Sequence, residues 1–231
     1  MTPHTLKNNL ARLPLFCELQ PQELERIAAG TSVAQLARDD ILFHVGRKLE
    51  HCYCIINGQI KLSVTAPSGA EKVVELVGPG RSFAEALLFL DLPSPVTAQA
   101  IEHSTIAIIP KSLIFDCIDH SREFTYRMLA GLSLRLHHLI SDLESYCLLT
   151  SSQRVVGYLL EEAQKTSPTT FHSRIVLPAN KNLIASRLHL TPETFSRTLH
   201  QLADEGLIKV TRKSIDIPNL DQLRCYGREP N

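Results

Sequence analysis

Residues 191–210 read TPETFSRTLHQLADEGLIKV and decide the fold of the C-terminal region. The hydroxyl of Thr191 can cap a helix, Pro192 fits the first helical position, and Glu193 suits the positive end of the helix. Apolar residues then recur at helical spacing until Gly206, which can end the helix. This stretch therefore predicts a capped amphipathic helix followed by a strand.

The surrounding residues extend this prediction to a winged helix-turn-helix. Asn180 can cap a shorter helix, and His189 with Leu190 forms a tight turn between the two helices. The β-rich runs 207–210 and 214–217 then read as the two strands of a wing. A helical hairpin whose charges are merely solvated is the alternative.

The second helix of this motif has the side chains of a DNA-reading helix on its outer face. Arg197 can bind guanine through two hydrogen bonds, Glu193 can accept from cytosine, and Ser196 can do either, so these three residues are predicted to read bases. Other residues would hold phosphates without reading sequence. They are Lys181, Thr191, His200, Arg212 and Lys213.

The charge distribution agrees with contact between the C-terminal third and phosphate. The whole chain has a formal net charge of zero. Residues 151–231 contain 11 Lys and Arg against 8 Asp and Glu, whereas residues 1–150 contain 13 against 16. The basic surplus therefore lies where the helix-turn-helix is predicted, which is the sign expected for a DNA partner.

Residues 33–110 have a different texture, with short β-rich runs separated by turn residues. Asn57-Gly58 lies between two such runs and predicts a hairpin, because both residues tolerate positive φ. Many short strands at regular spacing favour a jelly-roll barrel. Residues 83–90 interrupt this pattern and read as a short helix over a pocket.

The next helical region carries leucines at an alternating spacing of three and four residues. This a/d pattern forms a narrow apolar stripe that is typical of a helix paired with a copy of itself. We therefore expect a parallel homodimer, the alternative being a helix packed on its own barrel. The predicted seam consists of Leu129, Leu132, Leu136, Leu139 and Leu143.

A capping box at Thr150 and Gln153 predicts where the long helix gives way to the next one. The expected α+β chain then has a jelly-roll sensor in residues 1–118, a dimerisation helix in 119–149 and a winged helix-turn-helix in 150–231. A signal at the sensor would change the spacing of the two recognition helices through a hinge near Thr150.

Two stretches of this sequence resemble the CRP/FNR family of bacterial transcription regulators. They are Thr191-Pro192-Glu193-Thr194-Phe195-Ser196-Arg197 and Leu202-Ala203-Asp204-Glu205-Gly206-Leu207-Ile208. The resemblance implies activation of transcription with RNA polymerase as a partner, and its FNR-type triplet implies palindromic DNA with TTGAT-like half-sites. Phe83-Ala84-Glu85-Ala86 and Thr97-Ala98-Gln99-Ala100 look most like the dissimilatory nitrate respiration regulators, which implies nitric oxide sensing through haem.

Differences between this sequence and the other branches of the family limit which effector we expect it to sense. The cyclic-AMP branch has Gly-Glu-Leu and then Arg-Ser, where this chain has Ala84-Glu85-Ala86 and Pro95-Val96-Thr97. Without that arginine the cyclic phosphate loses its charged fork, so cyclic AMP is not expected. The iron–sulfur branch needs several N-terminal cysteines, and this chain has Cys17 alone there, so no iron–sulfur cluster is expected.

An apolar effector pocket is expected between the barrel and the long helix, and it could hold a haem. Its predicted residues are Phe83, Glu85, Ala86, Leu87, Val96, Thr97, Leu136, Leu139 and Ile140. A histidine would be the axial ligand, with nothing in the spacing to select one. The candidates are His4, His44, His51, His103, His120, His137 and His138. A regulator that binds a cyclic nucleotide or another small ligand without haem is the alternative.

The cysteine content and the absence of targeting and catalytic motifs limit the other classes of function and location that the sequence allows. With no signal peptide and no apolar run long enough to span a bilayer, we expect a cytoplasmic protein with reduced thiols and no membrane partner. Cys52 and Cys54 point the same way on a strand, so a redox or metal role competes with simple core packing. No catalytic motif is present, so the chain is not expected to be an enzyme.

Overall fold

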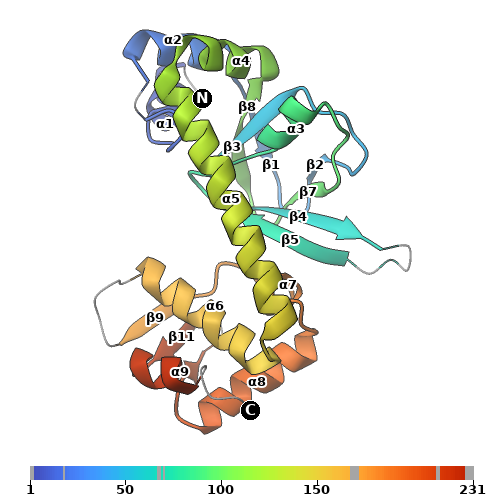
Figure 1. Ribbon diagram of the computed structural model, residues 1–231, viewed down its shortest axis with the longest axis vertical. Coiled ribbons are helices and arrows are strands. Elements are labelled where there is room, and N and C mark those ends of the chain that lie inside the picture. Colours follow the sequence, from blue (N-terminus) through green and yellow to red (C-terminus); the bar gives the residue numbers. More distant parts are fainter. Residues whose placement is uncertain are drawn as a thin grey trace. The chain divides into compact units, whose positions relative to one another are not determined.

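The computed structural model describes residues 3–17, 19–66, 69, 71–166, 172–211 and 214–226. The chain divides into two compact units, Met1–His137 and His138–Asn231, with the boundary inside the long helix α5 (Arg122–Leu148) (Figure 1). No helix within these described ranges is long and apolar enough to cross a membrane.

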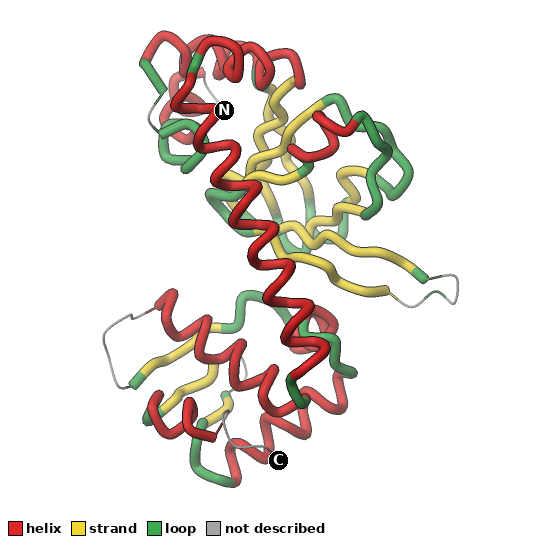
Figure 2. The backbone as a smooth tube through the Cα atoms, in the orientation of Figure 1, coloured by secondary structure: helices red, strands yellow, loops and turns green. Residues whose placement is uncertain are grey.

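The first unit contains two antiparallel four-stranded sheets, drawn in yellow in Figure 2. One sheet has the order β1 (Ser32–Leu36), β8 (Ser104–Pro110), β3 (His51–Asn57) and β6 (Ser82–Phe83). The other has the order β2 (Ile41–Phe43), β7 (Thr97–Ala100), β4 (Ile60–Thr65) and β5 (Glu71–Val77). The predicted jelly-roll fold is confirmed.

The Asn57-Gly58 turn does not form the predicted hairpin. It connects β3 to β4, but β3 pairs with β8 and β6, and β4 pairs with β5 and β7. Gly58 has a φ of +86°, and a Cβ there would collide with the backbone of Ser104. The glycine is thus required where the chain crosses from one sheet to the other.

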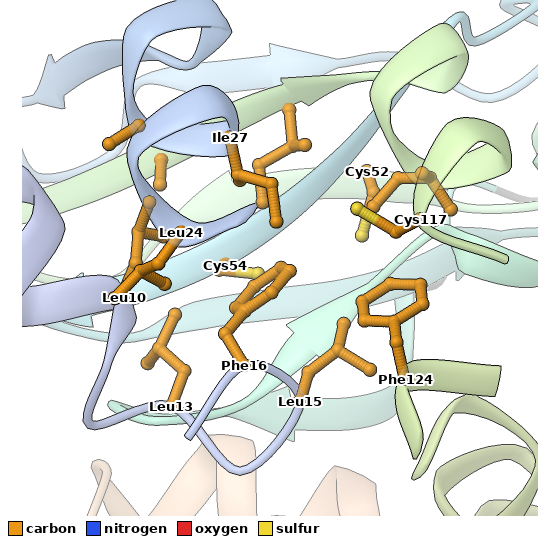
Figure 3. Packing of buried hydrophobic residues seen from close by; sticks show 14 of the residues in the cluster. Leu10, Leu13, Leu15, Phe16, Leu24, Ile27, Cys52, Cys54, Cys117 and Phe124 are labelled. Atoms are coloured by element: carbon orange, nitrogen blue, oxygen red, sulfur yellow. The ribbon is translucent and has the colours of Figure 1, made fainter. Parts of the chain in front are cut away.

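Strand β3 separates two apolar cores, which is why both of its faces are buried. Tyr53 and Ile55 face the barrel interior, together with side chains from both sheets. Cys52 and Cys54 face the opposite way, into a core formed with α1 (Pro3–Leu10), α2 (Pro21–Gly30), α4 (Lys111–His120) and the start of α5 (Figure 3). The helical cap therefore covers the outer face of one sheet.

The second unit is a winged helix-turn-helix, as predicted. It consists of the end of α5, α6 (Ser151–Thr166), β9 (Ser173–Val176), α7 (Lys181–Arg187), α8 (Pro192–Asp204), β10 (Lys209–Val210), β11 (Ser214–Ile217) and α9 (Leu220–Tyr226). The sheet order is β10-β11-β9, so β9, which the sequence pattern did not predict, completes the wing. The predicted capping box is present: Thr150 N donates to Gln153 Oε1 at 2.9 Å, and Gln153 N donates to Thr150 Oγ1 at 3.3 Å.

Candidate nucleic-acid interface and sensor core

Local capping fixes both helices of the helix-turn-helix. The side chain of Asn180 accepts from Leu183 N at 2.9 Å, and Thr191 Oγ1 accepts from Thr194 N at 3.2 Å, with Pro192 at the first helical position of α8. Each cap satisfies a backbone N–H group that the helix itself leaves unpaired. The start of α8 is therefore set by its own sequence, as predicted.

Helix α8 has one buried and one outer face. Phe195, Leu199 and Leu202 are buried in the core of the unit. Glu193 and Arg197 are exposed and Ser196 is half-buried. The structure thus places the three predicted base-reading side chains along one accessible face near the helix N-terminus.

Glu193 is held as a hydrogen-bond acceptor. A hydrogen bond from its own backbone N–H, followed by one from the Thr191 hydroxyl, lowers the pKa of the Glu193 carboxyl below its ordinary value. The shift favours the ionised carboxylate, which is the form that can accept from a cytosine amino group.

The predicted phosphate contacts are placed in part. Lys181 is the first residue of α7, and His200 is exposed on α8. The Thr191 hydroxyl caps α8. Arg212 and Lys213 lie outside the described residues.

Helix α5 carries an exposed apolar face. Leu136 is 60% exposed and Leu143 is 62% exposed, and Leu129 and Leu139 are also exposed. Leu132 was predicted at the same seam, but it is half-buried against the core of the helical cap, because it lies on the helix face that packs on its own sensor. The apolar stripe thus contains both residues that pack on the sensor and residues that stay exposed. A spacing of three and four residues alone cannot distinguish the two groups.

Ile140 shares this exposed face. It is 58% exposed, and it follows Leu136 by four residues and precedes Leu143 by three. Residues at these spacings are neighbours on a helix surface. Ile140, which the sequence comparison assigned to the effector pocket, is therefore also suited to the seam.

A buried carboxylate anchors the barrel helix α3 (Glu85–Leu90) to α5. Glu85 is 4% exposed, and its Oε2 accepts from Arg135 Nη1 at 3.0 Å. Arg135 Nη2 also donates to the Ser82 carbonyl at 2.7 Å, and its Nε lies 3.6 Å from Glu75 Oε2. Arg81 pairs with the other oxygen of Glu75 at 2.9 Å.

This cluster includes residues that the sequence analysis missed. Arg135 lies three residues after Leu132, on the α5 face that packs against the sensor. A cation within this apolar stripe was the one local sign that the face contains a buried ion pair. Its partner is 50 positions away in the sequence, and no local pattern identifies it.

The other predicted pocket residues separate into groups. Phe83 is buried in the barrel interior, and Leu87 and Val96 pack against the same cluster. The Thr97 hydroxyl accepts from Val45 N at 3.1 Å. Ala86 and Leu136 are exposed residues of the first unit. Leu139 and Ile140 are also exposed, but they belong to the second unit.

Aromatic rings fill part of the barrel interior. The Tyr53 ring lies 5.4 Å from that of Phe43 and 5.3 Å from that of Phe83. Burial raises the pKa of the Tyr53 hydroxyl. The imidazole of His51 lies 6.5 Å from the Tyr53 ring and is half-buried.

Among the candidate histidines with a described side chain, His51 alone is half-buried and the others are exposed. The side chain of His4 lies outside the described residues. Within this set, His51 is the histidine whose ring lies beside the aromatic ring of Tyr53.

Cys52 and Cys54 are core residues. Both are buried beside Cys117, Phe16 and Ile27 (Figure 3). A hydrogen bond with Cys54 and complete burial raise the pKa of the Cys52 thiol, and burial raises that of Cys117 to about 11. Metal binding and nucleophilic chemistry need the thiolate, which this environment disfavours. No three His, Cys, Asp or Glu side chains gather as a metal site within the described parts of the chain.

Comparison with known proteins identifies both units. Residues 33–121 match the cyclic nucleotide-binding domain family, and residues 153–226 match the Crp-like helix-turn-helix domain family. The CRP-like cAMP-activated global transcriptional regulator of Mycobacterium tuberculosis is 24% identical over 220 residues, which cover 95% of this chain and 98% of that protein. The relatives found are transcription regulators rather than enzymes.

Solved structures agree with this match. The regulator DNR from Pseudomonas aeruginosa is 32% identical over 95% of this chain and 96% of its own, with a TM-score of 0.50. FixK2 from Bradyrhizobium japonicum has a TM-score of 0.75 at 20% identity, covers 87% of this chain and 99% of its own, and shares the fold.

Proposed function

The chain belongs to the CRP/FNR family of transcription regulators, and we propose that it is a homodimer that reads palindromic DNA and senses an effector other than cyclic AMP. Regulators of this family bind DNA and act as dimers. Activation, with RNA polymerase as a partner, is part of the same proposal and rests on the family resemblance.

The accessible face of α8 that carries Glu193, Ser196 and Arg197 supports the DNA part of this proposal. A helix N-terminus that enters the major groove presents its first turns to base edges, and these three side chains occupy those turns. Their identities fit a half-site that contains guanine and cytosine contacts, which is compatible with TTGAT-like sequences.

The exposed face of α5 supports the dimer. Leucines at 129, 136 and 143 repeat every seven residues, as in a paired helix, and each is more than half exposed in the single chain. A second copy of the same helix is the occupant that such a repeat favours. Two-fold pairing in turn explains why the DNA site would be an inverted repeat.

Selection of random duplexes by the wild-type chain tests the DNA proposal, and we expect an inverted repeat with TTGAT-like halves. Arg197→Ala should then cost about 1–3 kcal/mol of binding to the selected duplex and relax the preference for its guanine. Arg224→Ala removes the same charge from α9 and is the control. Equal losses on selected and scrambled duplexes would contradict base reading, and enrichment of no symmetric site would contradict the DNA proposal as a whole.

We propose that the effector is nitric oxide bound through haem, as the resemblance to the nitrate respiration branch implies. The Pro95-Val96-Thr97 sequence disfavours a cyclic phosphate, because it has no arginine at the position where the cyclic-AMP branch has Arg-Ser. The Glu85 carboxylate, moreover, is already paired with Arg135. The half-buried His51 imidazole, which lies beside the Tyr53 ring, supports a haem with a histidine ligand. When bound, a haem would supply an iron that can bind a diatomic gas.

Absorption spectra of the chain produced with haem test this part. We expect a Soret band that moves on addition of nitric oxide and is lost in His51→Ala, whereas His103→Ala, at an exposed position, retains it. Cyclic AMP should leave the thermal midpoint unchanged, because a ligand stabilises only the state that it binds. The absence of a Soret band in the wild-type chain would refute the haem proposal and leave the DNA proposal intact.

A further inference from the structure

The turn between α7 and α8 is strained at one residue. His189 has a φ of +57°, in the left-handed region that residues other than glycine rarely adopt. Such a conformation costs free energy and persists where the surrounding structure holds it. The position of α8 depends on this turn, because His189 lies two residues before the cap of α8.

Arg154 on α6 holds the turn from one side. Its Nη1 donates to the carbonyl oxygens of Leu188 and His189, at 2.9 and 3.1 Å. Hydrogen bonds from a guanidinium are stronger than those between neutral groups. These two carbonyls belong to the peptides before and after His189, so this one side chain fixes the backbone on both sides of the strained residue.

The last turns of α5 hold the turn from another side. Asp142 Oδ2 lies 2.9 Å from Arg187 Nη1, at the end of α7, and neither side chain is fully exposed. The Tyr146 ring lies 4.6 Å from the His189 imidazole, and the Arg154 guanidinium lies 5.8 Å from the Tyr146 ring. All these residues belong to the second unit.

We propose that Asp142, Tyr146 and Arg154 are positioning residues for DNA reading. They clasp the α7–α8 turn to the end of α5, so the recognition helix α8 follows the last turns of the long helix. This proposal departs from the hinge near Thr150 that the sequence pattern led us to expect. The proposal rests on the DNA-binding function proposed above and adds how α5 is connected to the bases. Asp142, Tyr146, Arg154, Arg187 and His189 are called the clasp below.

Charge reversal within the clasp tests the proposal in the full-length chain. Asp142→Arg and Arg187→Asp should each lower the ratio of selected-duplex to scrambled-duplex affinity by about fivefold to tenfold. The double variant Asp142→Arg/Arg187→Asp should restore most of that ratio. The same exchange at Asp221 and Arg224, which also pair at 2.9 Å, is the control and should leave the ratio unchanged.

The two single variants change the net charge in opposite directions, so a general electrostatic effect would move DNA affinity in opposite directions. A fall in the ratio in both, with the thermal midpoint of the double variant near that of the wild type, is the expected result. An unchanged ratio in both single variants, or no recovery in the double variant, would overturn the clasp. A wild-type chain that selects no duplex would instead refute the DNA-binding proposal, so the two failures are distinguishable.

Discussion

Leu136→Glu is expected to convert the dimer into monomers and to abolish tight operator binding. The side chain is 60% exposed in the single chain, so glutamate leaves the fold of each protomer intact. In a two-fold pair the substitution places two carboxylates in one apolar seam, each without a partner. An unpaired charge at a buried site costs about 3–5 kcal/mol, and symmetry places one in each protomer.

Sedimentation measures this outcome directly. The wild type should sediment as two copies of a 25.8-kDa chain and the variant as one. Because a monomer holds one half-site, its affinity for the inverted repeat should fall about 100-fold or more. Leu134→Glu is the matched control, because Leu134 is 57% exposed on the same helix. Leu134 lies two residues from Leu136, so its side chain projects from nearly the opposite side of the helix. Unchanged sedimentation of Leu136→Glu would remove the α5 seam from the dimer.

Features determined by neighbouring residues were predictable from the sequence. The caps at Asn180 and Thr191 and the capping box at Thr150 each join groups three residues apart, and all three are present. The outer face of α8 follows from helical periodicity alone. Most of the candidate DNA interface could therefore be placed without coordinates.

Features determined by distant partners were not predictable. Asn57-Gly58 signals a reversal of the chain, but which strands pair depends on burial of both faces of β3 by residues distant in sequence. Strand β9 pairs with β11 across about 40 intervening positions and has no turn signal that links them. Leu132 fits the a/d spacing equally well on either side of α5, so only packing assigned it to the sensor.

The Glu85–Arg135 pair is the other feature of this kind, and Arg135→Met is expected to destabilise the sensor by about 3 kcal/mol, because breaking a buried pair leaves an uncompensated charge. Glu85 is buried, whereas the Arg135 side chain is 27% exposed, so the penalty falls on the carboxylate. Chemical denaturation of the full-length chain measures the loss. Arg122→Met, which removes an exposed arginine bonded to the Tyr126 hydroxyl on the same helix, should change stability by less than about 0.5 kcal/mol.

The double variant Glu85→Gln/Arg135→Met separates the charge from the packing. It removes both ionised groups while keeping side chains of similar size, so most of the lost stability should return. If the single and double variants lose the same free energy, the apolar stem of Arg135 rather than its charge holds α3 against α5. Recovery would show that the ionised Glu85–Arg135 pair, rather than the packing of the Arg135 stem, holds α3 against α5.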